Sequence, residues 1–128
     1  MPKTSPTTRS EQLLSQLGYV TDRCEMRVTS RIKRDLFGMF DLIAIAPGTT
    51  IGVQVTTSNN VAARVRKILD SEHAEDWLRA CNRIHVHGWY RSKKTMSWVC
   101  NRTIIRFDPD INWSNEIIAE KLEPLSLQ

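Results

Sequence analysis

The sequence predicts an α/β domain in which helices flank a central mixed β-sheet. Two neighbouring runs, at 40–46 and 51–57, are rich in apolar residues and are separated by turn-forming residues at 47–50. Both runs are apolar on nearly both faces, which is typical of central strands that helices cover. Segments with helical periodicity lie on either side of this pair, and another strand pattern follows at 83–91. A sheet packed between helices accounts for this succession of patterns.

The elements around the central pair follow from local signals. Ser10 should cap a first helix that ends at Gly18, and one or two strands should follow within 19–29. After the central strands, apolar residues at helical spacing predict one helix over 60–69 and another over about 72–81.

The last part of the chain is predicted to return to strands and to close with a helix. Lys93 and Lys94 should occupy a turn after the strand at 83–91. Two further strands are expected, at 96–100 and 103–107. Ser114 should then cap a helix that ends near Leu122.

The size and composition of the chain suit one globular domain. It has 128 residues, of which 41% are hydrophobic and 25% are charged. We expect residues 10–128 to form a single domain and the polar, Pro/Thr-rich residues 1–9 to form a disordered tail. The chain has no apolar run long enough for a membrane span, no secretory signal and no CxxC pair. We therefore expect a cytoplasmic protein that has neither a membrane partner nor a disulfide framework.

Each central strand carries a polar residue where an apolar one would be expected. Asp41 opens the first run, and Gln54 and Thr56 share one face of the second, because strand side chains alternate between faces. A buried carboxylate or amide costs free energy unless something binds it. The pair formed by Asp41 and Gln54 is therefore a candidate site.

This arrangement resembles the core of the PD-(D/E)XK nucleases, the superfamily of restriction enzymes, Holliday junction resolvases and VRR-NUC domains. In that superfamily, an Asp on one strand and an acidic residue two positions before a Lys on the next strand hold Mg²⁺. Asp41 matches the family Asp, Gln54 stands where Glu or Asp is usual, and Thr56 stands where Lys is usual. The resemblance extends from about Glu11 to Trp89. It implies a restriction-endonuclease-like core with the order helix, strands, helix, helix, strand.

The resemblance also implies a phosphodiester hydrolase that uses Mg²⁺ or Mn²⁺ and no organic cofactor. These cations take oxygen ligands. Asp41, the Gln54 side chain and the Val55 backbone carbonyl would bind the metal. Glu11 would add a second carboxylate if its helix packs over the central hairpin.

Thr56 cannot take the part of the family Lys, which orients the attacking water. In some members of the superfamily the basic residue lies on the neighbouring helix, and Lys67 is the candidate here. Arg64 lies one turn away on the same flank, but it is a poor base because it stays protonated. The predicted catalytic residues are therefore Asp41, Gln54 and Lys67.

Basic residues concentrate just before Asp41 and in the acid-free stretch between Asp76 and Asp108. Such surfaces attract nucleic-acid phosphates. The alternative is that these Lys and Arg side chains are solvated and keep strand edges from pairing. Six basic residues are the candidate contacts to duplex or branched DNA: Arg31, Lys33, Arg34, Arg64, Lys93 and Lys94.

Three functions remain open at this stage. The first is a bacterial or phage-encoded, Mg²⁺-dependent DNA endonuclease or resolvase, which could pair as a homodimer to cut two strands. The second is a catalytically inactive protein of the same fold that binds nucleic acid, which Gln54 and Thr56 favour. The third is a structural or partner-binding protein. In the last case, Asp41 would form a salt bridge with Arg31 or Lys33, and Gln54 would be a hydrogen-bonded core amide.

Overall fold

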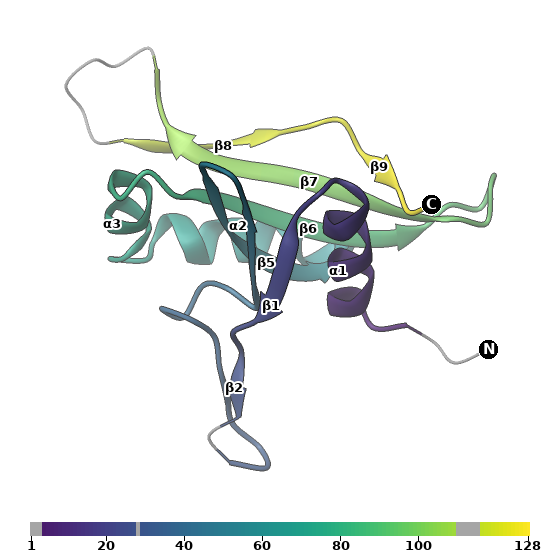
Figure 1. The fold of residues 1–128 in the computed structure, drawn as a ribbon, viewed down its shortest axis with the longest axis horizontal. Coiled ribbons are helices and arrows are strands. Elements are labelled where there is room, and N and C mark those ends of the chain that lie inside the picture. Colours follow the sequence, from purple (N-terminus) through teal and green to yellow (C-terminus); the bar gives the residue numbers. More distant parts are fainter. Residues whose placement is uncertain (1–3, 28, 110–115) are drawn as a thin grey trace.

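A computed structural model describes residues 4–27, 29–109 and 116–128 of the chain (Figure 1). The helical elements are α1 (Pro6–Gln16), the 3-10 helix η1 (Ser58–Asn60), α2 (Val61–Leu69) and α3 (Ala74–Arg79). The strands are β1 (Val20–Arg23), β2 (Met26–Arg27), β3 (Lys33–Arg34), β4 (Leu42–Ala46), β5 (Thr49–Thr57), β6 (Arg83–Arg91), β7 (Trp98–Phe107), β8 (Ile117–Lys121) and β9 (Leu125–Ser126). Within the described residues, no helix has the length and apolar character needed to span a membrane.

The central sheet is mixed, as the sequence predicts. Its strand order is β1-β4-β5-β6-β7-β8, and β9 also pairs with β7. β1, β4 and β5 form an antiparallel meander, whereas β6 runs parallel to β5. A parallel pair needs a crossover connection, which η1, α2 and α3 provide here. The central place predicted for the strands at 40–46 and 51–57 is confirmed by β4 and β5.

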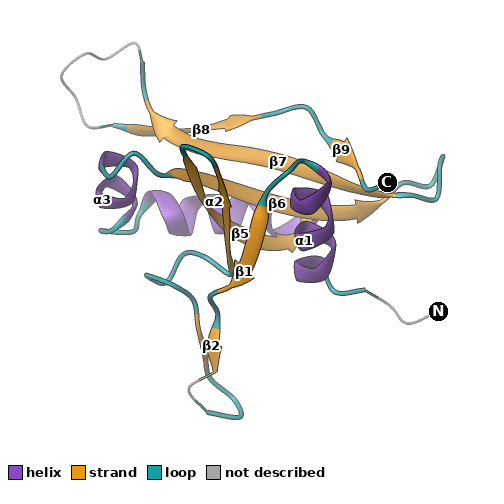
Figure 2. Cartoon of the chain, viewed as in Figure 1, coloured by secondary structure: helices purple, strands orange, loops and turns teal. Residues whose placement is uncertain are grey.

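Helices cover both faces of this sheet (Figure 2). Leu13 and Leu14 of α1 pack on one face, in a core cluster with Val53 of β5. Ile68 of α2 and Ala74 of α3 belong to a second cluster on the other face. The alternation of β5 therefore directs its apolar Ile51, Val53 and Val55 toward α1 and its Gly52, Gln54 and Thr56 toward α2.

The hairpin of β2 and β3 stands apart from the sheet. These two strands pair only with each other among the described strands, in a register that joins Met26 to Arg34 and Arg27 to Lys33. Figure 1 shows this hairpin projecting from the body of the molecule, between the end of β1 and the start of β4. Its position in the chain means that it leaves and rejoins the sheet next to Asp41.

The first helix begins earlier than predicted. Ser5 rather than Ser10 is the N-cap, because the Ser5 side chain accepts a hydrogen bond from a backbone N–H of the first turn and Pro6 takes the first helical position. Residues 6–9, which we expected in the tail, therefore belong to the helix. Ser10 is buried inside the helix, where its Oγ lies 2.9 Å from Nδ1 of His87.

The predictions for the C-terminal part are only partly correct. The predicted strands at 96–100 and 103–107 are one strand, β7, because the residues between them stay paired with β6. The predicted final helix is wrong where it can be tested, since Ile117–Lys121 forms β8 along β7; Ser114, its predicted cap, lies outside the described residues. Pairing with an otherwise open edge of β7 outweighs the helical pattern of this segment.

The other helical predictions are confirmed with small changes. The helix predicted over 60–69 is α2, and the helix predicted over 72–81 is the shorter α3. The predicted strand at 83–91 has the bounds of β6. Gly18 follows the end of α1 with a φ of +94°, a conformation that glycine adopts without strain.

Gly52 should be required because its lack of a side chain leaves room for the ring of Phe40, two residues before β4. A Cβ atom at Gly52 would lie 2.6 Å from the ring of Phe40, the residue before Asp41. We expect Gly52→Ala to destabilise the protein by about 1–3 kcal/mol, measured by urea denaturation. The penalty should be smaller in a Phe40→Leu background, because the shorter side chain frees space. Equal penalties in both backgrounds would contradict this steric explanation.

Candidate functional site

The side chains of Asp41 and Gln54 meet, as the sequence led us to expect. Asp41 lies directly before β4, and its backbone N–H donates to the Val53 carbonyl at 2.9 Å. Gln54 Nε2 donates to Asp41 Oδ2 at 2.8 Å. The backbone N–H of Val55 donates to the same oxygen at 2.7 Å. The two polar residues thus converge on one side of the sheet.

The Asp41 carboxylate completes the ladder between β4 and β5. The pairing of β4 with β5 ends at Leu42 and Val53. The next backbone N–H of β5 that points toward β4 belongs to Val55, and it donates to the Asp41 side chain. In a strand, the N–H and C=O of one residue project toward the same neighbour. The Val55 carbonyl therefore faces the edge on which Asp41 lies, which is compatible with its predicted place among metal ligands.

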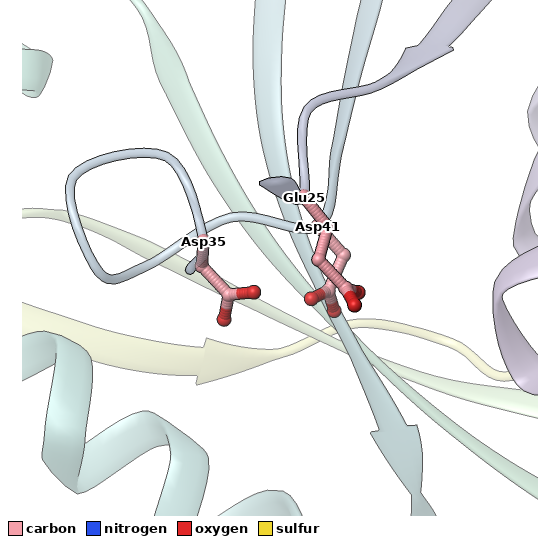
Figure 3. Close-up of side chains that lie close together, drawn as sticks. All are labelled: Glu25, Asp35 and Asp41. Carbon is pink, nitrogen blue, oxygen red and sulfur yellow. The ribbon is translucent and has the colours of Figure 1, made fainter. Parts of the chain in front are cut away.

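Two further carboxyl groups lie beside Asp41. Glu25 follows β1 and Asp35 follows β3, and one oxygen from each of these three residues lies within 4.8 Å of the others. Figure 3 shows the three side chains directed toward one another from three separate segments of the chain. We refer to Glu25, Asp35 and Asp41 as the acidic group.

Neither Glu25 nor Asp35 was among the site residues predicted from the sequence. The two residues are ten positions apart, and the hairpin of β2 and β3 brings them together because each stands at one end of it. The available signal was an acidic residue on either side of a short, basic hairpin pattern. That pattern predicts a cluster of carboxyl groups only once the hairpin is known to bring its two ends together.

The acidic group is electrostatically unfavourable by itself. Burial raises the pKa of the Asp41 carboxyl to about 7. The hydrogen bond from Val55 lowers it, whereas the neighbouring Asp35 and Glu25 raise it further. Lys33 Nζ lies 3.3 Å from Glu25 Oε1, but both side chains are partly exposed. Carboxylates this close hold a proton between them unless a cation neutralises their charge.

Gln54 adds a buried oxygen without a partner. Its side chain is 2% exposed, and its Oε1 accepts no hydrogen bond within the described residues. Such an unpaired buried group costs about 1–3 kcal/mol. Nε2 of the same Gln54 amide donates to Asp41. Rotating this amide by half a turn would therefore direct Oε1, in place of Nε2, toward the acidic group. A buried amide oxygen beside three carboxyl groups fits a hard divalent cation.

Glu11 lies elsewhere in the structure. Its carboxylate accepts hydrogen bonds from the guanidinium of Arg23, the shorter of them 2.6 Å long. The structure therefore places Glu25 and Asp35, rather than Glu11, beside Asp41. The alternative salt bridge of Asp41 with Lys33 is not formed either, since Lys33 pairs with Glu25.

The predicted catalytic lysine does not contact the acidic group. Lys67 is exposed on α2 and forms no ion pair with Asp41, Asp35 or Glu25, all of which the structure describes. Thr56 is buried on the same face of β5 as Gln54. The role of Lys67 in orienting water therefore stays a prediction.

The six predicted nucleic-acid contacts do not form one surface. Arg31, Lys33 and Arg34 are exposed on the hairpin of β2 and β3, close to the acidic group. Lys93 and Lys94 lie in the turn between β6 and β7, which Figure 1 shows at a different end of the molecule from this hairpin. Arg64 lies on α2, on the sheet face toward which Gln54 points. The basic hairpin is the part of this set that adjoins the candidate site.

No family model, curated protein or solved structure matches this chain. Its function therefore has to be inferred from the residues and contacts described above.

The raised pKa of Asp41 should contribute a loss of stability in the metal-free protein as the pH rises. Between about pH 4 and pH 7, the folded state keeps a proton at Asp41 that the unfolded chain has lost, so the contribution of Asp41 to the free energy of unfolding falls across this window. His85 and His87 contribute in the opposite direction, because burial lowers their pKa values to about 4 and about 3. The slope of the free energy of unfolding against pH should therefore be more positive in Asp41→Asn than in the wild type. Urea denaturation at about pH 5 and about pH 8, in the presence of a chelator, measures the effect. An exposed control, Asp70→Asn, should leave the slope unchanged, and an equal slope in Asp41→Asn would contradict the assignment.

Proposed function

We propose that this chain is a Mg²⁺- or Mn²⁺-dependent endonuclease that hydrolyses phosphodiester bonds in DNA. The observation that carries this proposal is the meeting of three carboxyl groups, from Glu25, Asp35 and Asp41, beside the buried Gln54 amide. Hard divalent cations take such oxygen ligands. The acidic group contains two more carboxylates than the pair found in the sequence. That addition offsets the weakness of a site built from one carboxylate and one amide.

The order of the elements supports a restriction-endonuclease-like core. Helix α1, the antiparallel strands β1, β4 and β5, the helices α2 and α3 and the parallel strand β6 follow in the order that the resemblance implies. Asp41 at the start of β4 and Gln54 on β5 also stand on the two strands to which the resemblance assigns metal ligands. The hairpin of β2 and β3 is an insertion within this order.

Phosphodiester hydrolysis joins a water oxygen to phosphorus while the bond to the leaving sugar oxygen breaks. A bound divalent cation supplies Lewis-acid stabilisation of the charge on the phosphoryl oxygens and lowers the pKa of the attacking water. Asp41, Glu25 and Asp35 would hold this cation, with the Gln54 oxygen and the Val55 carbonyl as further ligands. The proton that the water loses passes to a basic group, and the leaving oxygen takes a proton from solvent.

The basic hairpin is suited to hold the DNA backbone next to this chemistry. Arg31, Lys33 and Arg34 are exposed, and the hairpin ends at two members of the acidic group. Cationic side chains around a negatively charged centre allow a phosphate to approach it, because they offset the repulsion between carboxylates and phosphate. Guanidinium groups also bind phosphate oxygens in a bidentate manner.

Two observations favour a second candidate function, a nucleic-acid-binding protein of this fold without catalysis. Thr56 offers no amine to a water molecule, and Lys67 does not contact the acidic group. Retention on immobilised DNA that weakens with salt, without cleavage in Mg²⁺ or Mn²⁺, would favour this function over the first.

Mn²⁺ should raise the melting temperature of the wild type but not that of Asp41→Asn. A cation that binds only the folded state stabilises it by about 2.7 kcal/mol at a concentration of 100 Kd. A thermal-unfolding titration with Mn²⁺ measures this response. Asp35→Asn should weaken the rise, whereas Glu11→Gln should keep it, because Glu11 pairs with Arg23 and is not a member of the acidic group. An unchanged rise in Asp41→Asn would refute the metal assignment.

In Mg²⁺, the wild type should cleave duplex or branched DNA, and Asp41→Asn should lower the rate by about 100-fold or more. The variant should still bind DNA, because the basic hairpin is intact. Lys67→Ala should lower the rate without changing the Mn²⁺ response of the melting temperature. If Lys67→Ala is fully active, Lys67 is excluded as the residue that orients water. The assay is a timed gel separation of labelled DNA, with Arg66→Ala, exposed on the same helix, as a control.

A further inference from the structure

A pocket of about 680 Å³ adjoins the acidic group on the side of the basic hairpin. One wall comes from the hairpin, a second from the turn that precedes β4, and a third from the segment between α2 and α3. Its charged, polar and aromatic lining residues are Arg34, Asp35, Phe37, Ser71, Glu72 and His73, and Met26 adds an apolar side chain. Asp35 belongs both to the pocket and to the acidic group, so the two sites are continuous.

Phe37 occupies an unusual place in this pocket. It lies at the tip of a tight turn in which the Met39 N–H donates to the Leu36 carbonyl at 3.0 Å. Phe37 and Gly38 both have positive φ, of 55° and 70°. Glycine and asparagine are the residues that such a turn favours, and a bulky L-residue there costs about 1–2 kcal/mol.

The contacts of the Phe37 ring offset little of the free-energy cost of this backbone conformation. The residue is 50% exposed. The ring has a tilted neighbour in His73, at a centroid distance of 5.4 Å, and an edge contact with Trp77 at 6.2 Å. A large apolar ring that is held half-exposed at the mouth of a pocket provides a surface on which a planar ligand can stack.

The groups around the ring complete a site for a nucleotide. Arg34 is an exposed guanidinium in the pocket wall, and it can bind a phosphate or stack on a base. Met26, 66% exposed, adds an adaptable apolar surface. His73 also lines the pocket, with its Nε2 3.5 Å from a carboxylate oxygen of Glu72 and its Nδ1 3.8 Å from one of Asp76. Aromatic, cationic and polar groups together are what proteins use to hold an unpaired base.

The geometry points to an unpaired or extruded nucleotide as the occupant of this pocket. We propose that the base next to the cleaved phosphate leaves the helical stack and inserts between Phe37 and Met26, while Arg34 contacts the adjoining phosphate. This inference rests on the proposed function and specifies its substrate as DNA with an unpaired nucleotide at the cleavage point. A base inside an intact duplex cannot reach such a pocket, so extrusion or prior lack of pairing is required.

The test compares the binding of two DNA duplexes, one fully paired and one with a single unpaired nucleotide. The full chain is used with Ca²⁺ in place of Mg²⁺, so that binding is measured apart from turnover. Phe37→Asn removes the ring and places a residue favoured by the turn, so folding should be preserved. We expect this variant to bind the duplex with the unpaired nucleotide about 10-fold more weakly and the paired duplex as well as the wild type does.

A matched control is available at Met96. This residue also has a positive φ, of 57°, and is 61% exposed, but it lies in the turn between β6 and β7. Met96→Asn should leave the binding of both duplexes unchanged. A fluorescent base analogue at the unpaired position should be quenched on binding to the wild type and to Met96→Asn, and should stay bright with Phe37→Asn.

The outcomes separate this inference from the proposed function. Equal binding of the duplex with the unpaired nucleotide by Phe37→Asn and wild type, with equal quenching, would overturn the pocket assignment even if cleavage is observed. Loss of binding in Phe37→Asn without cleavage by the wild type would support the pocket and contradict only the catalytic proposal. If neither duplex binds the wild type, both proposals fail.

Discussion

A single oxygen of Asp41 organises the candidate site, because it accepts hydrogen bonds from both the Gln54 amide and the Val55 backbone. These bonds tie the residue before β4 to the middle of β5 after the regular pairing between the strands has ended. The carboxylate thereby satisfies a backbone donor that would lack a partner. In this position the Asp41 carboxylate lies beside those of Glu25 and Asp35.

The two faces of β5 differ in polarity. The side that faces α1 is apolar and packs against Leu13 and Leu14, which stabilises the sheet. The side that faces α2 carries Gln54 and Thr56, which are buried although they are polar. Stability supplied by the first side offsets the cost of an unsatisfied amide oxygen on the second.

The local patterns of the sequence predict much of the fold. Central strands β4 and β5, helix α2 and strand β6 follow from apolar periodicity, because burial dictates residue choice there. The strand β8 could not be found in this way, since its conformation depends on pairing with β7 rather than on its own residues. The start of α1 was misplaced because Ser10 has the chemistry of a cap but serves in a buried hydrogen bond to His87.

The candidate site was predicted only in part. Asp41 and Gln54 stand out because they interrupt apolar strands, and their meeting follows from strand alternation. Glu25 and Asp35 do not interrupt a run of apolar strand residues, so no local contrast of that kind marks them. Their role depends on the path of a hairpin, and Phe37 gains significance only from a backbone angle that residue type does not reveal.

The insertion of the hairpin has a thermodynamic consequence. Among the described strands, β2 and β3 pair only with each other, and Glu25 and Asp35 stand at the two ends of their hairpin. A cation bound between those ends would brace the stem against the body of the protein and fix the direction in which the arm extends. If the hairpin binds DNA as proposed, ion binding and DNA binding would then be reciprocally linked, each strengthening the other by the same factor.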